Sequence, residues 1–174
     1  MTADLHPTGD LYPTGLIVGR FCPPHLGHRF LIGWAAQRCA NLVVYVNTRD
    51  GEPVPGELRA SWLQEMTSEA TVVEVHHDLD TDWNDEELWN QWIALFRSKW
   101  PLAPELGGPH AVFSSDPYVD EIARRLGAEA VVVDPDRAAV PISATLIREY
   151  PDEYLDYLAP APRAWVEEHW VPKP

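Results

Sequence analysis

Short runs of Val, Ile and Leu recur along the chain, separated by longer segments whose apolar residues lie about 3.6 positions apart. The short runs do not alternate with polar residues, which is typical of strands that are covered on both faces. The longer segments indicate amphipathic helices. Because strands and helices alternate, the pattern predicts a parallel sheet with helices on both faces. The predicted strands are 16–18, 42–46, 71–75, 111–113 and 130–133.

Helices are predicted between these strands, and signals at two of their ends are specific. The third helix should be capped by Asn84, with Glu87 in the capping-box position. The fourth should begin near Pro117 and stop before Gly127, because proline favours the first turn of a helix and glycine the position after its end. The predicted helices are 29–36, 58–66, 88–96 and 119–126.

Prolines break the chain beyond residue 134 into short pieces, and two further helices are expected there, at 145–150 and about 162–170. We therefore predict an α/β fold: a single Rossmann-like, doubly wound parallel sheet of about five strands with a small C-terminal helical part. At 174 residues the chain is long enough for one well-buried domain. We assign this domain to residues 14–174 and treat residues 1–13 as an N-terminal extension.

The chain is acidic, with 27 Asp and Glu against 13 Lys and Arg and a formal net charge of −14. This balance argues against a nucleic-acid partner or an anionic membrane, because both need basic surfaces. The acidic net charge is compatible with a small, local basic pocket. No apolar stretch is long enough to span a bilayer, the first residues lack the pattern of a signal peptide, and two cysteines are too few for a disulfide scaffold. We therefore expect a cytoplasmic protein.

The most informative segment is the turn between the first predicted strand and its helix, Gly19-Arg20-Phe21-Cys22-Pro23-Pro24-His25-Leu26-Gly27-His28. A strand, a glycine-containing turn and a helix N-terminus form a favoured phosphate site. His25 and His28 should point to the same side of the first helical turn, beside free backbone N–H groups. Two such donors suit the negative charge that develops in nucleotidyl transfer. The alternatives are a helix cap without a ligand, and a zinc site, which lacks a clear third ligand.

A second candidate anion site lies near the end of the chain, in Ile142-Ser143-Ala144-Thr145-Leu146-Ile147-Arg148. Ser143 is a natural N-cap, and Thr145 would lie in the first helical turn with its hydroxyl free. Arg148 falls one turn later and can reach back toward the same ligand. Taken alone, a capped helix with an arginine is more often structural. Together with the histidine turn, this segment predicts a second binding site for the same polyphosphate.

These two segments resemble the paired signature of the nucleotidylyltransferase superfamily, Gly-x-Phe-x-Pro-x-His-x-Gly-His and Ile-Ser-x-Thr-x-x-Arg. Other segments resemble the adenylyltransferase domain of NadR-type proteins, and the resemblance covers about residues 14–170. It implies nicotinamide mononucleotide (NMN) adenylyltransferase activity, in which ATP and NMN give NAD and pyrophosphate, with Mg²⁺ sharing the charge. The segments that narrow the resemblance are 55–59, 114–118, 133–137 and 157–160, with Arg163 after the last.

The resemblance also implies roles for the motif residues. His25 and His28 would hold the ATP phosphates and stabilise the α-phosphorus while the NMN phosphate attacks in line. Arg148 would hold the phosphates that leave, and no protein nucleophile is needed. The other residues expected to bind ATP are Gly19, Arg20, Phe21, Gly27, Ser143 and Thr145.

Weaker signals concern the acceptor. Asn47 follows a predicted strand and could meet the substrate or form a turn. Trp83 or Trp89 could stack on a cationic nicotinamide ring, although helical spacing favours a core position for Trp89. Arg59 could contact phosphate or lie on the surface. The acidic loop 76–83 is more typical of a solvated loop than of a metal site, and we expect no metal held by the protein itself. The candidates for substrate binding are Asn47, Arg59, Trp83, Trp89, Ser115 and Asp116.

The chain departs from its relatives at a position that is often basic and is Leu26 here, which leaves one positive charge fewer near the phosphates. It also lacks the Gly-x-x-x-x-Gly-Lys-Ser/Thr loop of a kinase domain and an N-terminal helix-turn-helix, so we expect neither kinase nor repressor activity. Nicotinate mononucleotide and phosphopantetheine are alternative acceptors of the adenylyl group. A non-catalytic nucleotide-binding module is an alternative function, and a homo-oligomer is an alternative to a monomer.

Overall fold

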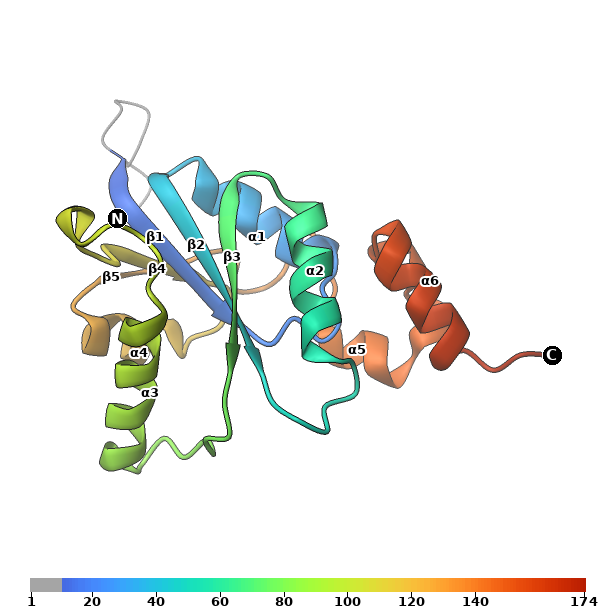
Figure 1. Ribbon diagram of the computed structural model, residues 1–174. Coiled ribbons are helices and arrows are strands. Elements are labelled where there is room, and N and C mark those ends of the chain that lie inside the picture. Colours follow the sequence, from blue (N-terminus) through green and yellow to red (C-terminus); the bar gives the residue numbers. More distant parts are fainter. Residues whose placement is uncertain (1–10) are drawn as a thin grey trace.

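The computed structural model describes residues 11–174, which form one five-stranded sheet in the order β3-β2-β1-β4-β5 (Figure 1). Every neighbouring pair of strands is parallel, as the alternation of strands and helices predicts. The strands are β1 (Tyr12–Gly19), β2 (Cys39–Thr48), β3 (Ala70–His76), β4 (Ala111–Ser114) and β5 (Glu129–Val132).

The first two strands are longer than predicted. β1 and β2 pair from Tyr12 opposite Cys39 to Gly19 opposite Val46. The ends of these strands contain polar residues and a proline, which interrupt the apolar pattern, whereas the pairing of the backbones continues past them. β1 therefore begins inside the predicted extension 1–13, and residues 1–10 of that extension lie outside the described residues.

The ends of two helices test the capping signals that were read from the sequence. α4 ends as predicted, because Gly127 follows it with a φ of 73°, a left-handed conformation that glycine adopts readily. α3 is capped by Asp85 and not by Asn84: the Asp85 side chain accepts a hydrogen bond from the N–H of Leu88 at 3.0 Å. Since the cap lies one residue later than predicted, Glu87 does not occupy the capping-box position. The helices of residues 11–174 are α1 (Leu26–Ala36), α2 (Gly56–Met66), α3 (Glu86–Lys99), α4 (Val119–Leu126), α5 (Ala144–Glu149) and α6 (Pro160–His169), with short 3-10 turns at Pro104–Leu106, Pro151–Glu153 and Leu155–Tyr157.

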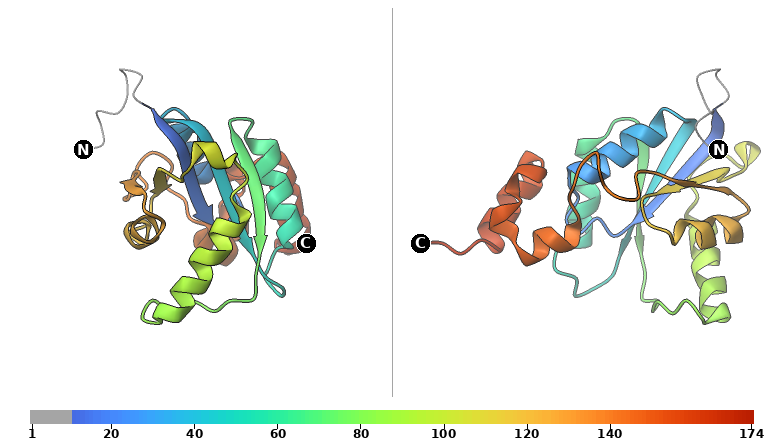
Figure 2. Two further views of the ribbon diagram at one scale, coloured as in Figure 1. Left: turned by 60° about the vertical axis from the view of Figure 1, so that its left-hand side comes forward. Right: turned by 180° about the vertical axis from the view of Figure 1, so that it is seen from behind.

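Helices cover both faces of the sheet (Figure 2). Ile17 and Val44 pack under α1 and α2, while Leu16 and Tyr45 pack under α3 and α4. Successive strand residues therefore alternate between two apolar layers, which explains why the strand sequences are continuously hydrophobic. The sheet is doubly wound, as predicted. Among residues 11–174, every helix is too short or too polar to cross a membrane.

The C-terminal part packs beside α2 and not on the sheet. Figures 1 and 2 show α6 standing next to α2, with α5 leading to it. Trp165 of α6 meets Trp62 of α2 with ring centroids 6.0 Å apart, and both belong to a hydrophobic cluster that includes Cys22. This packing keeps the C-terminal helices close to the turn that carries the histidines.

Candidate active site

A cavity of about 820 Å³ lies at the carboxyl ends of the strands, where doubly wound sheets bind their ligands. Its walls come from the segments after β1, β2, β3 and β4 and from the starts of α1 and α5. The fold thus brings the two sequence motifs to one place. Every predicted site residue except Arg59 lines the cavity. These residues are Gly19, Arg20, Phe21, His25, Gly27, His28, Asn47, Trp83, Trp89, Ser115, Asp116, Ser143, Thr145 and Arg148.

His25 and His28 cap α1 reciprocally. Nδ1 of His25 accepts hydrogen bonds from the backbone N–H groups of Gly27 and His28, at 3.0 and 3.3 Å. Nδ1 of His28 accepts one from the N–H of His25 at 3.1 Å, and the two rings stack with their centroids 3.6 Å apart. The cap therefore uses three backbone N–H groups, whereas such groups were expected to be free for a ligand. It occupies only the Nδ1 atom of each ring.

The cap determines which ring nitrogen carries the proton. A neutral imidazole has one donor and one acceptor nitrogen, so acceptance at Nδ1 leaves the proton on Nε2. Burial, helped by the charge of Arg137, lowers the pKa of His25 to about 3. Burial also holds the pKa of His28 well below its usual value, with smaller effects of His25 and Arg137. Both rings are therefore neutral at pH 7, and each has an Nε2–H donor at the cavity.

Small and aromatic residues of the same motif keep the two rings in place. A Cβ atom on Gly27 would lie 2.8 Å from Cε1 of His25, so a side chain there would displace the ring. Phe21 is buried and packs edge-on against His28, with ring centroids 4.6 Å apart. A Cβ atom on Gly19 would in turn lie 3.1 Å from the Phe21 ring. These residues act through their packing around the histidines.

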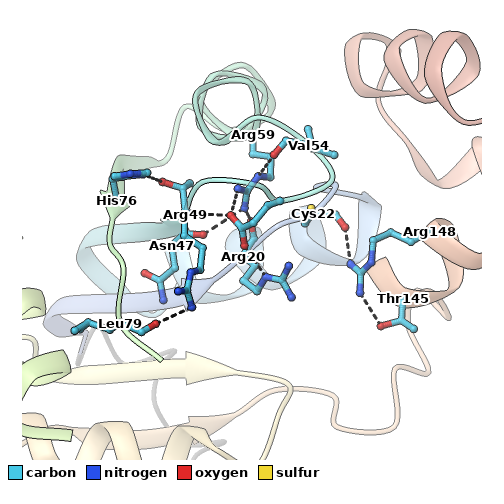
Figure 3. Close-up of polar contacts among 12 residues, drawn as sticks. Arg20, Cys22, Asn47, Arg49, Val54, Arg59, His76, Leu79, Thr145 and Arg148 are labelled. Carbon is cyan, nitrogen blue, oxygen red and sulfur yellow. Dashed lines mark hydrogen bonds and ion pairs between the residues drawn. The ribbon is translucent and has the colours of Figure 1, made fainter. Parts of the chain in front are cut away.

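Arg148 joins the two motifs (Figure 3). Its Nη1 donates to the carbonyl oxygen of Cys22 at 2.6 Å, across 126 positions of sequence, and its Nη2 donates to Oγ1 of Thr145 at 3.3 Å. Ser143 caps α5 as predicted, with Oγ accepting from the N–H of Leu146 at 3.2 Å. The oxygen of the Thr145 hydroxyl, which was predicted to be free, accepts from Arg148, because side chains three apart on a helix are neighbours. Its O–H can still donate.

Arg137 is a cavity residue that the sequence analysis did not single out. It lies in the loop after β5 with a positive φ of 54°. Its Nη2 donates to Oδ1 of Asp116 at 3.3 Å, and its Nη1 donates to the carbonyl oxygen of Ile142 at 3.4 Å. Its charge contributes to the lowered pKa of both His25 and His28. The segment 133–137 resembled a family, but only the fold places its arginine near the histidines.

Comparisons with known proteins agree with this geometry. The chain is 27% identical over 162 residues to the trifunctional NAD biosynthesis/regulator protein NadR of Escherichia coli, and 26% identical over 161 residues to that of Salmonella typhimurium. Each match covers 83% of this chain and 38% of the relative, so the chain spans less than half the length of these curated relatives. No family model matches the chain.

Solved structures share the fold. A crystal structure of NadR in complex with NAD and AMP-PNP has a TM-score of 0.60 at 21% identity, over 84% of this chain and 44% of that one. A bifunctional NMN adenylyltransferase/ADP ribose pyrophosphatase of Francisella tularensis, complexed with AMP and manganese, has a TM-score of 0.64 at 16% identity. The match covers 92% of this chain and 51% of that one. The chain is thus similar in sequence to part of NadR, and it shares its fold with these structures.

Arg59 lies behind the cavity, completely buried on α2 (Figure 3). Its Nε donates to the carbonyl oxygen of Val54 at 3.0 Å, and Nη2 pairs with Glu52. Its Nη1 donates to the carbonyl oxygens of Arg20 and Asn47, at 2.7 and 3.3 Å. Because buried guanidinium donors need partners, Arg59 ties the ends of β1 and β2 to the loop before α2. It is therefore neither a surface residue nor placed to meet a phosphate.

Two further arginines add positive charge to the rim. Arg49, which the sequence analysis did not consider, lines the cavity and donates from Nη1 to the carbonyl oxygen of Leu79 at 2.9 Å. This bond links the loops after β2 and β3. Arg20 pairs with Glu52 at 3.1 Å, and its side chain is about half exposed. Together with Arg148 these residues form a local basic pocket in an acidic protein.

Tryptophans form the side of the cavity next to α3. Trp89 is buried, the guanidinium of Arg125 covers one face of its ring at 4.6 Å, and the ring of Trp83 lies edge-on to it at 5.2 Å. Trp83 is 50% exposed. Of the two predicted stacking residues, Trp83 therefore has the accessible ring, and Trp89 is mainly a core residue.

Ser115 and Asp116, which follow β4, also line the cavity, and their polar groups are largely paired. The hydroxyl of Ser115 donates to the carbonyl oxygen of Val133 at 2.6 Å, and Asp116 accepts from Arg137. In the part of the chain that the structure describes, no three His, Cys, Asp or Glu side chains are grouped so that they could hold a metal ion.

Proposed function

We propose that this domain transfers the adenylyl group of ATP to NMN, giving NAD and pyrophosphate. The observation that supports this most is the junction of the two motifs: Arg148 is hydrogen-bonded to the turn that carries the Nε2–H donors of His25 and His28. The name of the curated relatives supports a role in NAD biosynthesis. NadR structures of the same fold contain NAD with AMP-PNP, or NR.

In the proposed reaction a phosphate oxygen of NMN attacks the α-phosphorus of ATP. The bond between this oxygen and the α-phosphorus forms while the bond to the bridging oxygen breaks, and pyrophosphate leaves with that oxygen and the electron pair. The Nε2–H groups of His25 and His28 donate to the α-phosphate oxygens, whose charge they bind more strongly in the transition state. Because both imidazoles are neutral, they act as hydrogen-bond donors and transfer no proton in this step.

The phosphates that leave are held at the other motif. Arg148 pairs with their oxygens, and the hydroxyls of Ser143 and Thr145 donate to them from the start of α5. Mg²⁺ enters with ATP and neutralises part of the phosphate charge. Such an ion would keep phosphate and water ligands and need few from the protein.

The test is an assay with ATP, Mg²⁺ and one of three acceptors: NMN, nicotinate mononucleotide or phosphopantetheine. We expect NAD and pyrophosphate in equal amounts from NMN, measured by chromatography and a coupled pyrophosphate assay. No dinucleotide from NMN would overturn the proposal. Pyrophosphate from phosphopantetheine alone would indicate another acceptor. ATP binding without pyrophosphate from any acceptor would indicate a non-catalytic module.

A further inference from the structure

Asn47 contains a buried side-chain atom without a hydrogen-bond partner. Among residues 11–174, its Oδ1 is the buried side-chain nitrogen or oxygen atom that has no hydrogen-bond partner. Asn47 also lines the cavity. Buried polar atoms in native proteins are nearly always paired, and one left unpaired lowers stability. An unpaired acceptor at the wall of a substrate cavity therefore indicates a hydrogen-bond donor on the substrate.

The sheet determines toward which part of the cavity the Asn47 side chain points. Val46 packs in the apolar layer under α1 and α2, and Tyr45 packs in the layer under α3 and α4. Because side chains alternate along a strand, Asn47 points to the same side as Tyr45, beside its pairing partner Val75 on β3. Figure 3 shows its carboxamide directed away from α2 and Arg59.

The backbone of Asn47 is held rigidly. It pairs with Val75 of β3, and its carbonyl oxygen accepts from the buried guanidinium of Arg59 at 3.3 Å. The side chain therefore projects from a fixed point, as a residue that discriminates between similar ligands requires. Arg59 is a positioning residue for it.

The neighbouring side chains suit a flat, cationic ring. Trp83 and Trp89 line the cavity on the α3 side, toward which Asn47 points. Aromatic faces attract a cationic pyridinium ring. Asp82 also lines the cavity, whereas the charge of Glu52 is paired with Arg20 and Arg59. The tryptophans and Asp82 favour the cationic ring, and the choice between the amide and the acid falls to Asn47.

We propose that Oδ1 of Asn47 accepts an N–H hydrogen bond from the carboxamide of the pyridine ring, and so selects NMN against nicotinate mononucleotide. This inference rests on the proposed adenylyl transfer. The amide group of NMN has N–H donors, whereas the carboxylate of nicotinate mononucleotide has none at pH 7. With the acid bound, Oδ1 would stay unpaired and face a second acceptor. A site that hydrogen-bonds one substrate rejects the analogue that lacks the donor.

The experiment compares kcat/KM for NMN and for nicotinate mononucleotide in the wild type and in Asn47→Ala and Asn47→Asp. We expect the wild type to prefer NMN. Asn47→Ala should lower kcat/KM for NMN by about tenfold or more, raise kcat/KM for the acid because the opposing acceptor is gone, and so reduce the preference. Asn47→Asp keeps an acceptor and should still use NMN while rejecting the acid further. Asn41→Ala, at the opposite end of β2, is the matched control. The KM for ATP should stay constant in all variants.

Several outcomes would overturn the inference. Equal losses for both acceptors in Asn47→Ala would place the contact on the ribose or phosphate. A raised KM for ATP in Asn47→Ala would indicate that Asn47 contacts the adenylate. A wild type that prefers nicotinate mononucleotide would exclude the proposed selection directly. Calorimetric titration with each mononucleotide separates this failure from that of the proposed function: selective NMN binding that depends on Asn47, without any dinucleotide product, would overturn only the proposed reaction.

Discussion

A histidine that caps a helix and also serves a reaction must divide these tasks between its two ring nitrogens. In His25 and His28, Nδ1 accepts backbone N–H groups at the start of α1, and Nε2 keeps the proton. The cap thus fixes both the orientation of each ring and its tautomer. Substitutions that preserve the capping acceptor can therefore separate helix stability from chemistry at this site.

Replacement of His28 tests this division. His28→Ala should lower kcat on the order of 100- to 1,000-fold, with little change in the KM for ATP, because the donor acts mainly in the transition state. His28→Gln should unfold at the wild-type temperature and still have a low kcat, since glutamine at this position completes a capping box. Steady-state kinetics and thermal denaturation measure both effects. His169→Ala, in α6, is the control, and an unchanged kcat in His28→Ala would contradict the assignment.

At the scale of the elements, backbone conformation decides which glycines are required. Gly33 in α1 and Gly127 after α4 both face open space, because a Cβ atom added to either would meet no heavy atom within 4 Å. They differ in backbone angle: Gly127 has a φ of 73°, whereas Gly33 lies inside a helix. The two positions thus form a matched pair in which packing is equal and only the backbone differs.

Alanine should have opposite effects at these two positions. Gly33→Ala should raise the free energy of unfolding by about 1 kcal/mol, since alanine favours the helix interior. Gly127→Ala should lower it by about 1 kcal/mol or more, since a Cβ atom is strained at positive φ. Urea denaturation at pH 7 measures both changes. Effects of the same sign would show that the end of α4 does not depend on the left-handed residue.

At the scale of the whole molecule, pH acts through two opposing effects. Lower pH protonates carboxylates and reduces the repulsion that accompanies a net charge of −14. His25 acts in the other direction, because its pKa is about 3 in the folded protein and 6.5 ordinarily. Between these pH values the unfolded chain binds more protons than the folded one, so the free energy of unfolding contributed by His25 falls as the pH falls.

His25→Asn isolates the contribution of this histidine, because asparagine is a favoured N-cap and does not titrate in this range. From pH 7 to pH 5 the wild type should lose roughly 2 kcal/mol more of its free energy of unfolding than the variant. Urea denaturation at both pH values measures this difference, in which the effect of net charge cancels. Equal losses would mean that His25 is not neutral in the folded protein.

Local patterns in the sequence were enough to predict the elements, their parallel arrangement and the two motifs. The spacing of apolar residues marked each strand and helix, and Ser143 and Gly127 were recognised at helix ends, because these signals act over a few neighbouring residues. The same locality explains the errors. Asn84 and Asp85 are both good caps, and the choice between them depends on where α3 begins against the sheet.

The tertiary structure alone decided what each arginine does. Arg59 and Arg137 both end segments that resemble the family, yet Arg59 is buried among backbone carbonyls while Arg137 lies near the histidines. Arg148 reaches the carbonyl oxygen of Cys22, and Oδ1 of Asn47 is left without a partner, for the same reason. The partners and the burial of a side chain depend on which distant segments meet, whereas secondary structure follows from interactions along the chain itself.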